Sequence, residues 1–302
     1  MTAVAVIEAQ GLTKSYGKRR GVTDLTLAVP AGEVFGFLGP NGAGKTTTIR
    51  TLLGFLRPSS GRAALFGTDV VGHTAALHRR IGYLPGELAL YEKMTGHDLL
   101  TYFGHLRGSS DLTYATTIAE RLGADLSRPI RTLSKGNKQK IGLVQAFMHR
   151  PALLILDEPT GGLDPLVQQE FYRLVADAKA AGQTVFLSSH ILSEVDHVAD
   201  RVGIIREGRL VVVEEIKALK SKTVRRLDIQ LAAAVPEAAF TGLPGVRDLH
   251  IAGDTMRCTV EGPMDGLIKA LAGYPVISLT SHEPDLEEIF LTYYMGGTPN
   301  AA

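Results

Sequence analysis

The first segment that could do chemistry is a glycine-rich run that ends in a lysine and a threonine. Residues 39–46 (Gly-Pro-Asn-Gly-Ala-Gly-Lys-Thr) fit the phosphate-binding pattern G-x-x-x-x-G-K-[ST], in which backbone N–H groups form a concave anion site. An apolar run at residues 34–38 precedes it, and residues 47–53 are typical of a helix whose N-terminus attracts negative charge. We therefore expect a triphosphate here, with Lys45 on the β- and γ-phosphates and the Thr46 hydroxyl on a magnesium ion.

A second candidate site is a pair of carboxylates at the end of a predicted buried strand. Residues 153–156 are apolar, and Asp157 and Glu158 follow them directly. Because adjacent residues at a strand end point in different directions, Asp157 can hold hydrated magnesium while Glu158 faces an attacking water. Two acidic residues after a strand can also be a solvated strand end. The phosphate-binding pattern upstream favours the catalytic interpretation.

Two further polar segments are ambiguous when taken alone. Residues 134–137 (Ser-Lys-Gly-Asn) begin a predicted helix, where they can bind an anion or where Ser134 can simply cap the helix. A second anion site suggests a nucleotide held between two copies of the protein. His190 follows a predicted strand at residues 184–187 and is either a γ-phosphate contact or an ordinary surface histidine.

The elements that must position these residues alternate between strands and helices. After amphipathic strands at residues 5–9 and 25–29, the predicted buried strands are residues 34–38, 152–156, 184–187 and 201–205. This order predicts a mostly parallel sheet covered by helices. Residues from about 90 to 150 lack buried strands and predict an inserted helical subdomain, with helices at Gly96–Leu106 and Asn137–His149. A hairpin at Glu207-Gly208 closes this domain, which we place at residues 1–216.

Beyond residue 216 the pattern predicts a small α+β accessory domain at residues 217–302. After a polar link at residues 217–222, the predicted strands are residues 224–231, 246–251, 256–260 and 276–280. The predicted helices are residues 236–240, 264–272 and 285–294. The order β-α-β-β-α-β resembles a ferredoxin-like domain.

Composition restricts the classes of function. Charged residues make up 21% of the 302 residues and the formal net charge is +1, which gives no electrostatic reason to expect nucleic-acid binding. The sole cysteine, Cys258, cannot form an internal disulfide, as suits a reducing cytosol. The sequence has no apolar run of about 18 residues and no basic start typical of a signal peptide. We therefore expect a cytoplasmic protein without direct membrane insertion, for which any work at a membrane needs a partner.

Taken together, these motifs resemble the nucleotide-binding subunit of an ATP-binding cassette (ABC) transporter. The resemblance covers roughly residues 5–216 and includes a D-loop at residues 162–164. It implies a P-loop ABC ATPase fold and two copies stacked head to tail. Each ATP would lie between residues 39–47 of one copy and the signature segment, residues 133–137, of the other.

The resemblance also assigns individual roles. Glu158 would be the general base or water-polarising group, His190 the switch histidine, Tyr16 the ring that stacks on adenine, and Asp164 a link between the two sites. The predicted catalytic residues are Glu158, His190 and Lys45, and the predicted metal ligands are Thr46 and Asp157. The residues expected to bind ATP are Tyr16, Gly39, Pro40, Asn41, Gly42, Ala43, Gly44, Lys45, Thr46, Thr47, Ser134, Lys135, Gly136, Asn137 and Asp164.

Two positions depart from the family pattern. The Q-loop glutamine is replaced by Gly86, which has no side chain to ligate magnesium. Either water or the neighbouring Glu87 fills its place, or Glu87 is a solvated loop charge. The signature reads L-S-K-G-N, so that Lys135 is either a cation near the γ-phosphate or a solvent-facing lysine.

The signature, the Y-L-P-G-E loop and residues 283–291 resemble bacterial antibiotic and multidrug exporters, including daunorubicin-resistance-like ATPases. This branch implies a separate integral membrane permease, a homodimer of this chain, and a peripheral location on the inner face of the cell membrane. Phe290, Tyr293 and Tyr294 could dock on a partner or pack in a core. The alternatives are a soluble ABC ATPase that acts on ribosomes and a nucleotide-gated regulatory dimer with negligible turnover.

Overall fold

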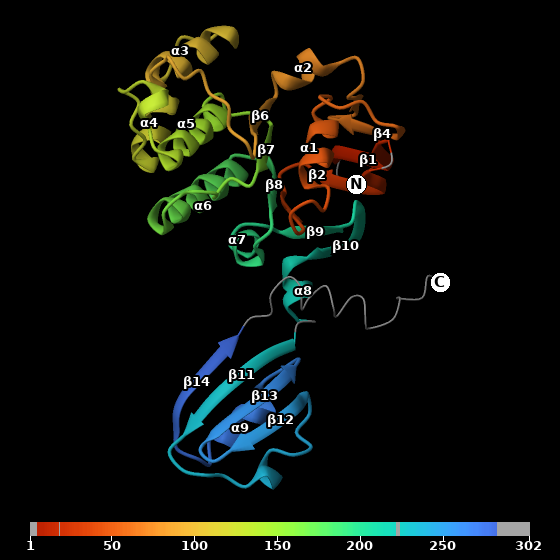
Figure 1. Ribbon diagram of the computed structural model, residues 1–302, viewed down its shortest axis with the longest axis vertical. Helices are drawn as coiled ribbons and strands as arrows, with labels where there is room; N and C mark the ends of the chain where they lie inside the picture. Colours follow the sequence, from red (N-terminus) through yellow and green to blue (C-terminus); the bar gives the residue numbers. More distant parts are fainter. Residues whose placement is uncertain (1–4, 18, 222–223, 283–302) are drawn as a thin grey trace. The chain divides into compact units, whose positions relative to one another are not determined.

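The computed structural model describes residues 5–17, 19–221 and 224–282 (Figure 1). The chain forms two compact units, Met1–Glu214 and Glu215–Ala302. Each unit has its own hydrophobic core. No helix within the described part of the chain is long and apolar enough to cross a membrane.

A six-stranded sheet in the order β10-β9-β3-β8-β7-β6 forms the centre of the first unit. Its strands are β3 (Val34–Leu38), β6 (Ile81–Leu84), β7 (Leu153–Asp157), β8 (Thr184–Ser189), β9 (Arg201–Arg206) and β10 (Arg209–Glu215). The run β9-β3-β8-β7-β6 is parallel, which confirms the predicted mostly parallel sheet. Strands β3, β7 and β8 are buried along their whole length, as continuous apolar runs in a covered parallel sheet require.

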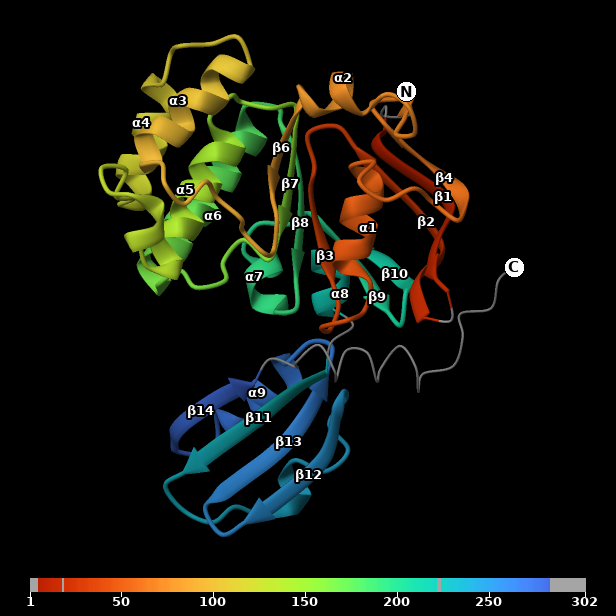
Figure 2. The ribbon, with the colours of Figure 1, turned by 45° about the horizontal axis from the view of Figure 1, so that its top comes forward.

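Helices cover both faces of this sheet. Figure 2 shows α1 (Lys45–Leu52) on one side of β6, β7 and β8, and α5 (Lys135–Phe147) and α6 (Pro165–Ala180) on the other. The short helix α7 (Leu192–Asp196) contacts β8 and β3. The N-terminus of α1 thus lies at the carboxyl end of β3, where open α/β sheets bind ligands.

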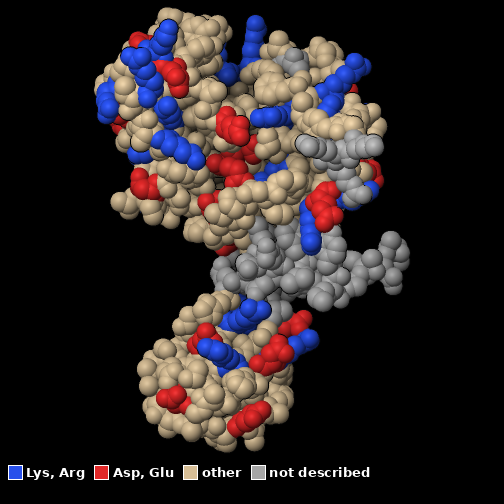
Figure 3. Space-filling view, viewed as in Figure 1, with Lys and Arg blue, Asp and Glu red and all other residues tan. Residues whose placement is uncertain are grey.

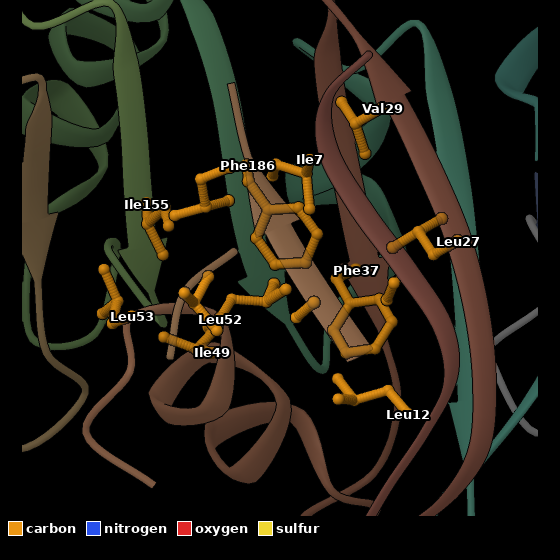
Figure 4. Packing of buried hydrophobic residues seen from close by; sticks show 14 of the residues in the cluster. Ile7, Leu12, Leu27, Val29, Phe37, Ile49, Leu52, Leu53, Ile155 and Phe186 are labelled. Atoms are coloured by element: carbon orange, nitrogen blue, oxygen red, sulfur yellow. The ribbon is translucent and has the colours of Figure 1, made fainter. Parts of the chain in front are cut away.

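A four-stranded antiparallel sheet packs over α1 and fixes its position. Its order is β2-β1-β4-β5, with β1 (Ala5–Tyr16), β2 (Arg19–Pro30), β4 (Ser60–Leu65) and β5 (Thr68–Asp69). Figure 4 shows that Ile49 and Leu52 of α1 meet Phe37 and Phe186 of the parallel strands. Strands β1 and β2 extend well beyond the predicted residues 5–9 and 25–29, because their main-chain pairing continues through polar positions to Tyr16 and Arg19.

Three helices form the predicted insertion between β6 and β7. They are α3 (Gly96–Leu106), α4 (Thr113–Leu122) and α5. The short helix α2 (Thr74–His78) lies before β6 and is not part of the insertion. Helix α3 has the predicted bounds, and a capping box between Thr95 and Asp98 fixes its start. Helix α5 begins at Lys135 rather than the predicted Asn137, because Ser134 is its N-cap.

Among its described residues, the second unit has a four-stranded antiparallel sheet and two α-helices, the first of which, α8 (Ile216–Ser221), precedes the sheet. Its elements are β11 (Val224–Leu231), η2 (Glu237–Ala239), β12 (Val246–Ala252), β13 (Thr255–Glu261), α9 (Asp265–Leu271) and β14 (Val276–His282). In the order β12-β13-β11-β14, strand β13 lies between β11 and β12 and is antiparallel to both. This is the split βαβ arrangement of ferredoxin-like domains.

Two predictions for the second unit differ from the structure. The predicted first helix, residues 236–240, is only a three-residue 3₁₀ turn, because Gly242, Pro244 and Gly245 follow at once and prevent a second helical turn. The predicted polar link is helical up to Ser221, in α8 (Ile216–Ser221). The last predicted helix, residues 285–294, lies outside the described residues, as do Phe290, Tyr293 and Tyr294.

Candidate nucleotide-binding and catalytic site

The phosphate-binding loop has the backbone shape that only glycine allows. Gly42 and Gly44 have φ angles of 79° and 112°, and Gly44 is the residue before the first turn of α1. At Gly39 a Cβ atom would lie 2.4 Å from the carbonyl oxygen of Ile205. The loop is therefore a cradle of backbone groups without side chains, which fits a phosphate group.

Lys45 is held over this loop. Its side chain is only 6% exposed, and Nζ donates to the carbonyl oxygens of Gly39 at 2.6 Å and Pro40 at 3.3 Å. The same Nζ lies 3.1 Å from Oε1 of Glu158. The ammonium group is thus fixed between the loop and the predicted base, where it can neutralise phosphate charge.

Asp157 lies at the carboxyl end of β7, fully buried, between two hydroxyl groups. Thr46 Oγ1 donates to Oδ2 of Asp157 at 2.8 Å, and Ser188 Oγ donates to Oδ1. The predicted metal ligands Thr46 and Asp157 are therefore in direct contact. Ser188, at the end of the neighbouring strand β8, was not singled out from the sequence. The run of two serines before His190 was the signal that could have found it.

Glu158 bridges two cationic or polar partners. While Oε1 faces Lys45, Oε2 lies 2.7 Å from Nδ1 of His190. The backbone of Glu158 has a φ angle of 51°, an uncommon left-handed value for a residue with a side chain. Its N–H donates to the Ser188 carbonyl oxygen at 3.2 Å, which holds this conformation.

A cavity of about 560 Å³ unites these groups. Its lining residues include Tyr16, Asn41, Gly42, Gly44, Lys45, Thr46, Thr47, Arg50, Gly86, Glu87, Asp157 and Glu158. Figure 3 shows acidic side chains grouped near the middle of the first unit's visible face, with basic side chains on both sides. The structure therefore brings together the predicted phosphate loop, the carboxylate pair and, through Glu158, His190.

The Q-loop position lies directly beside the buried carboxylate. A Cβ atom on Gly86 would be 3.2 Å from Oδ2 of Asp157, so any side chain there would press on the predicted metal ligand. Glu87 lines the same cavity and is exposed. Burial and the negative charge of Asp157 raise the pKa of the Tyr83 hydroxyl.

The signature segment does not join this cavity. The hydroxyl of Ser134 caps α5 by accepting from the Asn137 N–H at 3.2 Å. The side chain of Asn137 is engaged with the backbone of Asp125, accepting at 2.8 Å and donating at 3.0 Å. Lys135 is exposed. The side chains of Ser134 and Asn137 thus make their hydrogen bonds within this copy, whereas Lys135 is open to solvent.

Gly136 links the signature to the D-loop. A Cβ atom on Gly136 would lie 2.8 Å from the carbonyl oxygen of Gly162, so the two segments are in close backbone contact. Asp164 is the N-cap of α6, and its carboxylate accepts from the Val167 N–H at 3.1 Å. The two segments thus form one surface, separate from the residues that line the nucleotide cavity.

A second cavity of about 810 Å³ lies at the amino end of β6. Arg107 donates to the carbonyl oxygen of Ile81 at 3.4 Å, and the Arg150 guanidinium lies 4.3 Å from the ring centre of Tyr114. His149 Nε2 is 3.1 Å from the same Ile81 oxygen, and burial together with the charge of Arg107 lowers the pKa of His149 to about 4. No residue predicted to bind or hydrolyse ATP lines this cavity.

Comparison with known proteins identifies the fold and the family. The model of the family described as ABC transporter matches residues 22–161. The bacitracin transport ATP-binding protein BcrA of Bacillus licheniformis is 35% identical over 305 residues, which cover 97% of this chain and 98% of that protein. This chain belongs to the ABC transporter family of ATP-binding proteins. The resemblance inferred from the motifs is thereby confirmed.

Two further similarities agree with this assignment. The daunorubicin/doxorubicin resistance ATP-binding protein DrrA of Streptomyces peucetius is 36% identical over 303 residues, or 94% of this chain and 91% of that protein. A solved structure of an ATP-binding subunit of an ABC transporter is 30% identical with a TM-score of 0.66, over 71% of this chain and 92% of that chain. The ABC family chain described here is thus an ATP-hydrolysing transporter subunit with a P-loop fold. The ribosome-acting and regulatory alternatives are not favoured.

Proposed function

We propose that this chain powers the export of an antibiotic or drug through a separate membrane permease. Relatives named for bacitracin transport and for daunorubicin/doxorubicin resistance support this substrate class. By the same likeness, the chain works on the cytoplasmic side of the membrane and is held there by its permease.

The observation that carries the catalytic proposal is the position of the Glu158 carboxylate between Lys45 and His190. We assign Glu158 as the general base that accepts a proton from the attacking water. Lys45 neutralises charge on the β- and γ-phosphates, and His190 orients Glu158 and contacts the γ-phosphate. Tyr16, which is 46% exposed at the end of β1, offers a ring for the adenine.

The donor set around Asp157 fits a magnesium ion. A hydroxyl and a carboxylate oxygen, those of Thr46 and Asp157, lie 2.8 Å apart, and magnesium is commonly held by one or two protein oxygens together with phosphates and water. Among the described residues, no group of three or more acidic, histidine or cysteine side chains could form an all-protein metal site. Thr46 and Asp157 would hold the ion, which would supply positive charge to neutralise negative charge on the phosphates.

The site of one copy is incomplete, which supports a dimer. The surface made by the exposed Ser134, Lys135 and Asp164 and the half-buried Gly136 lines no part of the nucleotide cavity of its own chain. In the head-to-tail dimer that we propose, this surface closes over the ATP bound by the partner copy. Asn137 acts there indirectly, because its side chain fixes the backbone of Asp125 beside the start of α5.

The first test is affinity purification of the native complex from detergent-solubilised cells, with partners identified by mass spectrometry. We expect a stoichiometric multi-spanning membrane protein, whose binding pocket then decides the substrate. Recovery of ribosomal proteins, or of this chain alone, would contradict the proposal.

The dimer has its own test in Gly136→Ala. The added methyl group would meet the Gly162 carbonyl oxygen at 2.8 Å and displace the signature from the D-loop. We expect ADP binding within twofold of wild type but loss of ATP-dependent dimers in light scattering. Gly266→Ala is the control, because a Cβ atom there meets nothing within 4 Å. Dimer formation by Gly136→Ala at the wild-type ATP concentration would count against the head-to-tail model.

A further inference from the structure

Glu194 of α7 connects two loops that meet at the catalytic carboxylate. Its two carboxylate oxygens accept from two different hydroxyl groups, Thr160 Oγ1 at 2.6 Å and Ser189 Oγ at 2.6 Å. Thr160 is 4% exposed and Ser189 is fully buried. Thr160 follows Glu158 by two residues, and Ser189 directly precedes His190. A single side chain therefore joins the loop of the predicted base to the loop of the predicted histidine.

Together with the Glu158–His190 contact, these hydrogen bonds form a closed ring of residues. The pair itself is one side of the ring, with 2.7 Å between Oε2 and Nδ1. The backbone from His190 to Ser189, the Glu194 carboxylate, and the backbone from Thr160 to Glu158 complete it. The Ser189 hydroxyl also accepts from the Ile191 N–H at 3.0 Å, which fixes the turn that follows His190.

The backbone at Glu158 needs such support. Its φ angle of 51° is strained for a residue with a side chain, and conformations of this kind persist only where the surroundings hold them. Two hydrogen bonds from the Glu158 N–H to Ser188 restrain one side of the loop. The Thr160–Glu194 hydrogen bond restrains the other side, two residues further along.

Within the part of the chain that the structure describes, Glu194 forms no ion pair. Among the residues that the structure describes, its carboxylate has hydroxyl partners and no cation. The pKa of the neighbouring Tyr172 is raised by burial and by the negative charge of Glu194. The Glu194 carboxylate thus serves as an acceptor for two hydroxyl groups. A glutamine at position 194 could replace it, because its amide group can both accept and donate and each hydroxyl group can do either.

We propose that Glu194 is a positioning residue for ATP hydrolysis, which holds Glu158 and His190 in their productive geometry without touching the nucleotide. The inference rests on the proposed catalytic roles of Glu158 and His190. Small displacements of a catalytic group lower the rate of the chemical step much more than the affinity for substrate. Loss of the clamp, defined as Thr160, Ser189 and Glu194, should therefore lower kcat and leave nucleotide binding intact.

The test compares Glu194→Ala with Glu194→Gln in the full-length protein. We expect Glu194→Ala to lower kcat by about tenfold to a hundredfold, with ADP affinity within twofold of wild type. Glu194→Gln should recover most of the rate. Ser193→Ala on the same helix is the control and should match wild type. Hydrogen exchange of the backbone amides of residues 158–161, measured with ADP bound, should quicken in Glu194→Ala alone.

Variants that remove only one of the two hydroxyl partners of Glu194 keep the proposal testable if Glu194→Ala unfolds. Thr160→Val and Ser189→Ala each remove one hydroxyl and should each lower kcat, and Ser189→Ala should add little in a Glu194→Ala background because the two act as one unit. An unchanged kcat in Glu194→Ala would overturn the proposal. So would a double variant in which the effects of Ser189→Ala and Glu194→Ala on kcat multiply in full. If instead Glu158→Gln hydrolyses ATP at the wild-type rate, the assignment of the base fails, whatever Glu194 does.

Discussion

Two cavities of the first unit are lined by charged side chains, but the charged groups in them have different kinds of partner. At the carboxyl ends of the strands, Lys45 contacts the Glu158 carboxylate in addition to two backbone carbonyl oxygens. The Asp157 carboxylate there accepts from the Thr46 hydroxyl, so both charged groups also have side-chain partners on other elements. At the amino end of β6, Arg107 and Arg150 contact a backbone carbonyl oxygen and an aromatic ring. Paired, adjustable groups can exchange partners with a substrate, whereas charges tied to the backbone hold elements together.

The difference follows from the ends of the parallel strands. Strands β3, β7 and β8 deliver Gly39, Asp157 and His190 to one edge simply by ending there. The opposite edge receives helix ends, such as that of α5 before His149, and the cations there cover carbonyl oxygens. We therefore expect substitutions in the first cavity to change activity and substitutions in the second to change stability.

The largest effect on nucleotide binding is expected for Lys45→Ala. Removal of the ammonium group eliminates charge-assisted hydrogen bonds to phosphate, each of which contributes about 1.5–3 kcal/mol. ADP affinity should fall by about tenfold to a hundredfold in a fluorescent-nucleotide titration. Lys135→Ala is the matched control, because Lys135 is exposed and lines no part of the cavity. An equal loss of ADP affinity in both variants would contradict the assignment of the phosphate contact to Lys45 rather than Lys135.

A smaller effect, on stability alone, is expected for Arg107→Met. Arg107 is exposed as a residue, but partial desolvation of its guanidinium lowers its pKa. Its removal leaves the carbonyl oxygen of Ile81 with one donor fewer, which should cost about 1–3 kcal/mol in urea unfolding. The kcat for ATP should stay within twofold of wild type. A large loss of kcat in a folded variant would show that the second cavity takes part in function.

The smallest effect is a pH dependence of stability that comes from His149. Its pKa is lowered to about 4 in the folded protein, compared with about 6.5 in an unfolded chain. Between these values the unfolded state binds more protons, so the stability falls as the pH drops from 7 towards 4. This group should account for about 2 kcal/mol between pH 7 and pH 5. His149→Gln should remove that part of the dependence, and an unchanged pH profile would contradict the assignment.

Much of the fold and the main motif could be predicted from the sequence, because both depend on local patterns. Buried strands are continuous apolar runs, and residues 34–38 and 184–187 were found in this way. Helix α3 was predicted with its observed bounds, and the structure shows that a capping box of Thr95 and Asp98 fixes its start. The backbone shape of the phosphate loop follows from its glycines.

What could not be predicted depends on contacts between distant segments. The Lys45–Glu158 contact and the clamp at Glu194 join residues that are far apart in the sequence or lie on short, weakly patterned elements such as α7. The hydrogen bond from Asn137 to the Asp125 backbone could not be predicted either, because an asparagine near the start of a helix can equally well bind an anion. The short strand β6 has too few residues to show a periodicity.

The most direct test of the account is ATP binding, dimer formation and turnover by Glu158→Gln, measured on one preparation. We expect kcat to fall by about a hundredfold or more, because the general base is lost. We also expect ATP and magnesium to convert the variant from a monomer to a stable dimer in light scattering. Steady hydrolysis at the wild-type rate would contradict the role of Glu158, and a variant that binds ATP yet stays monomeric would contradict the shared site.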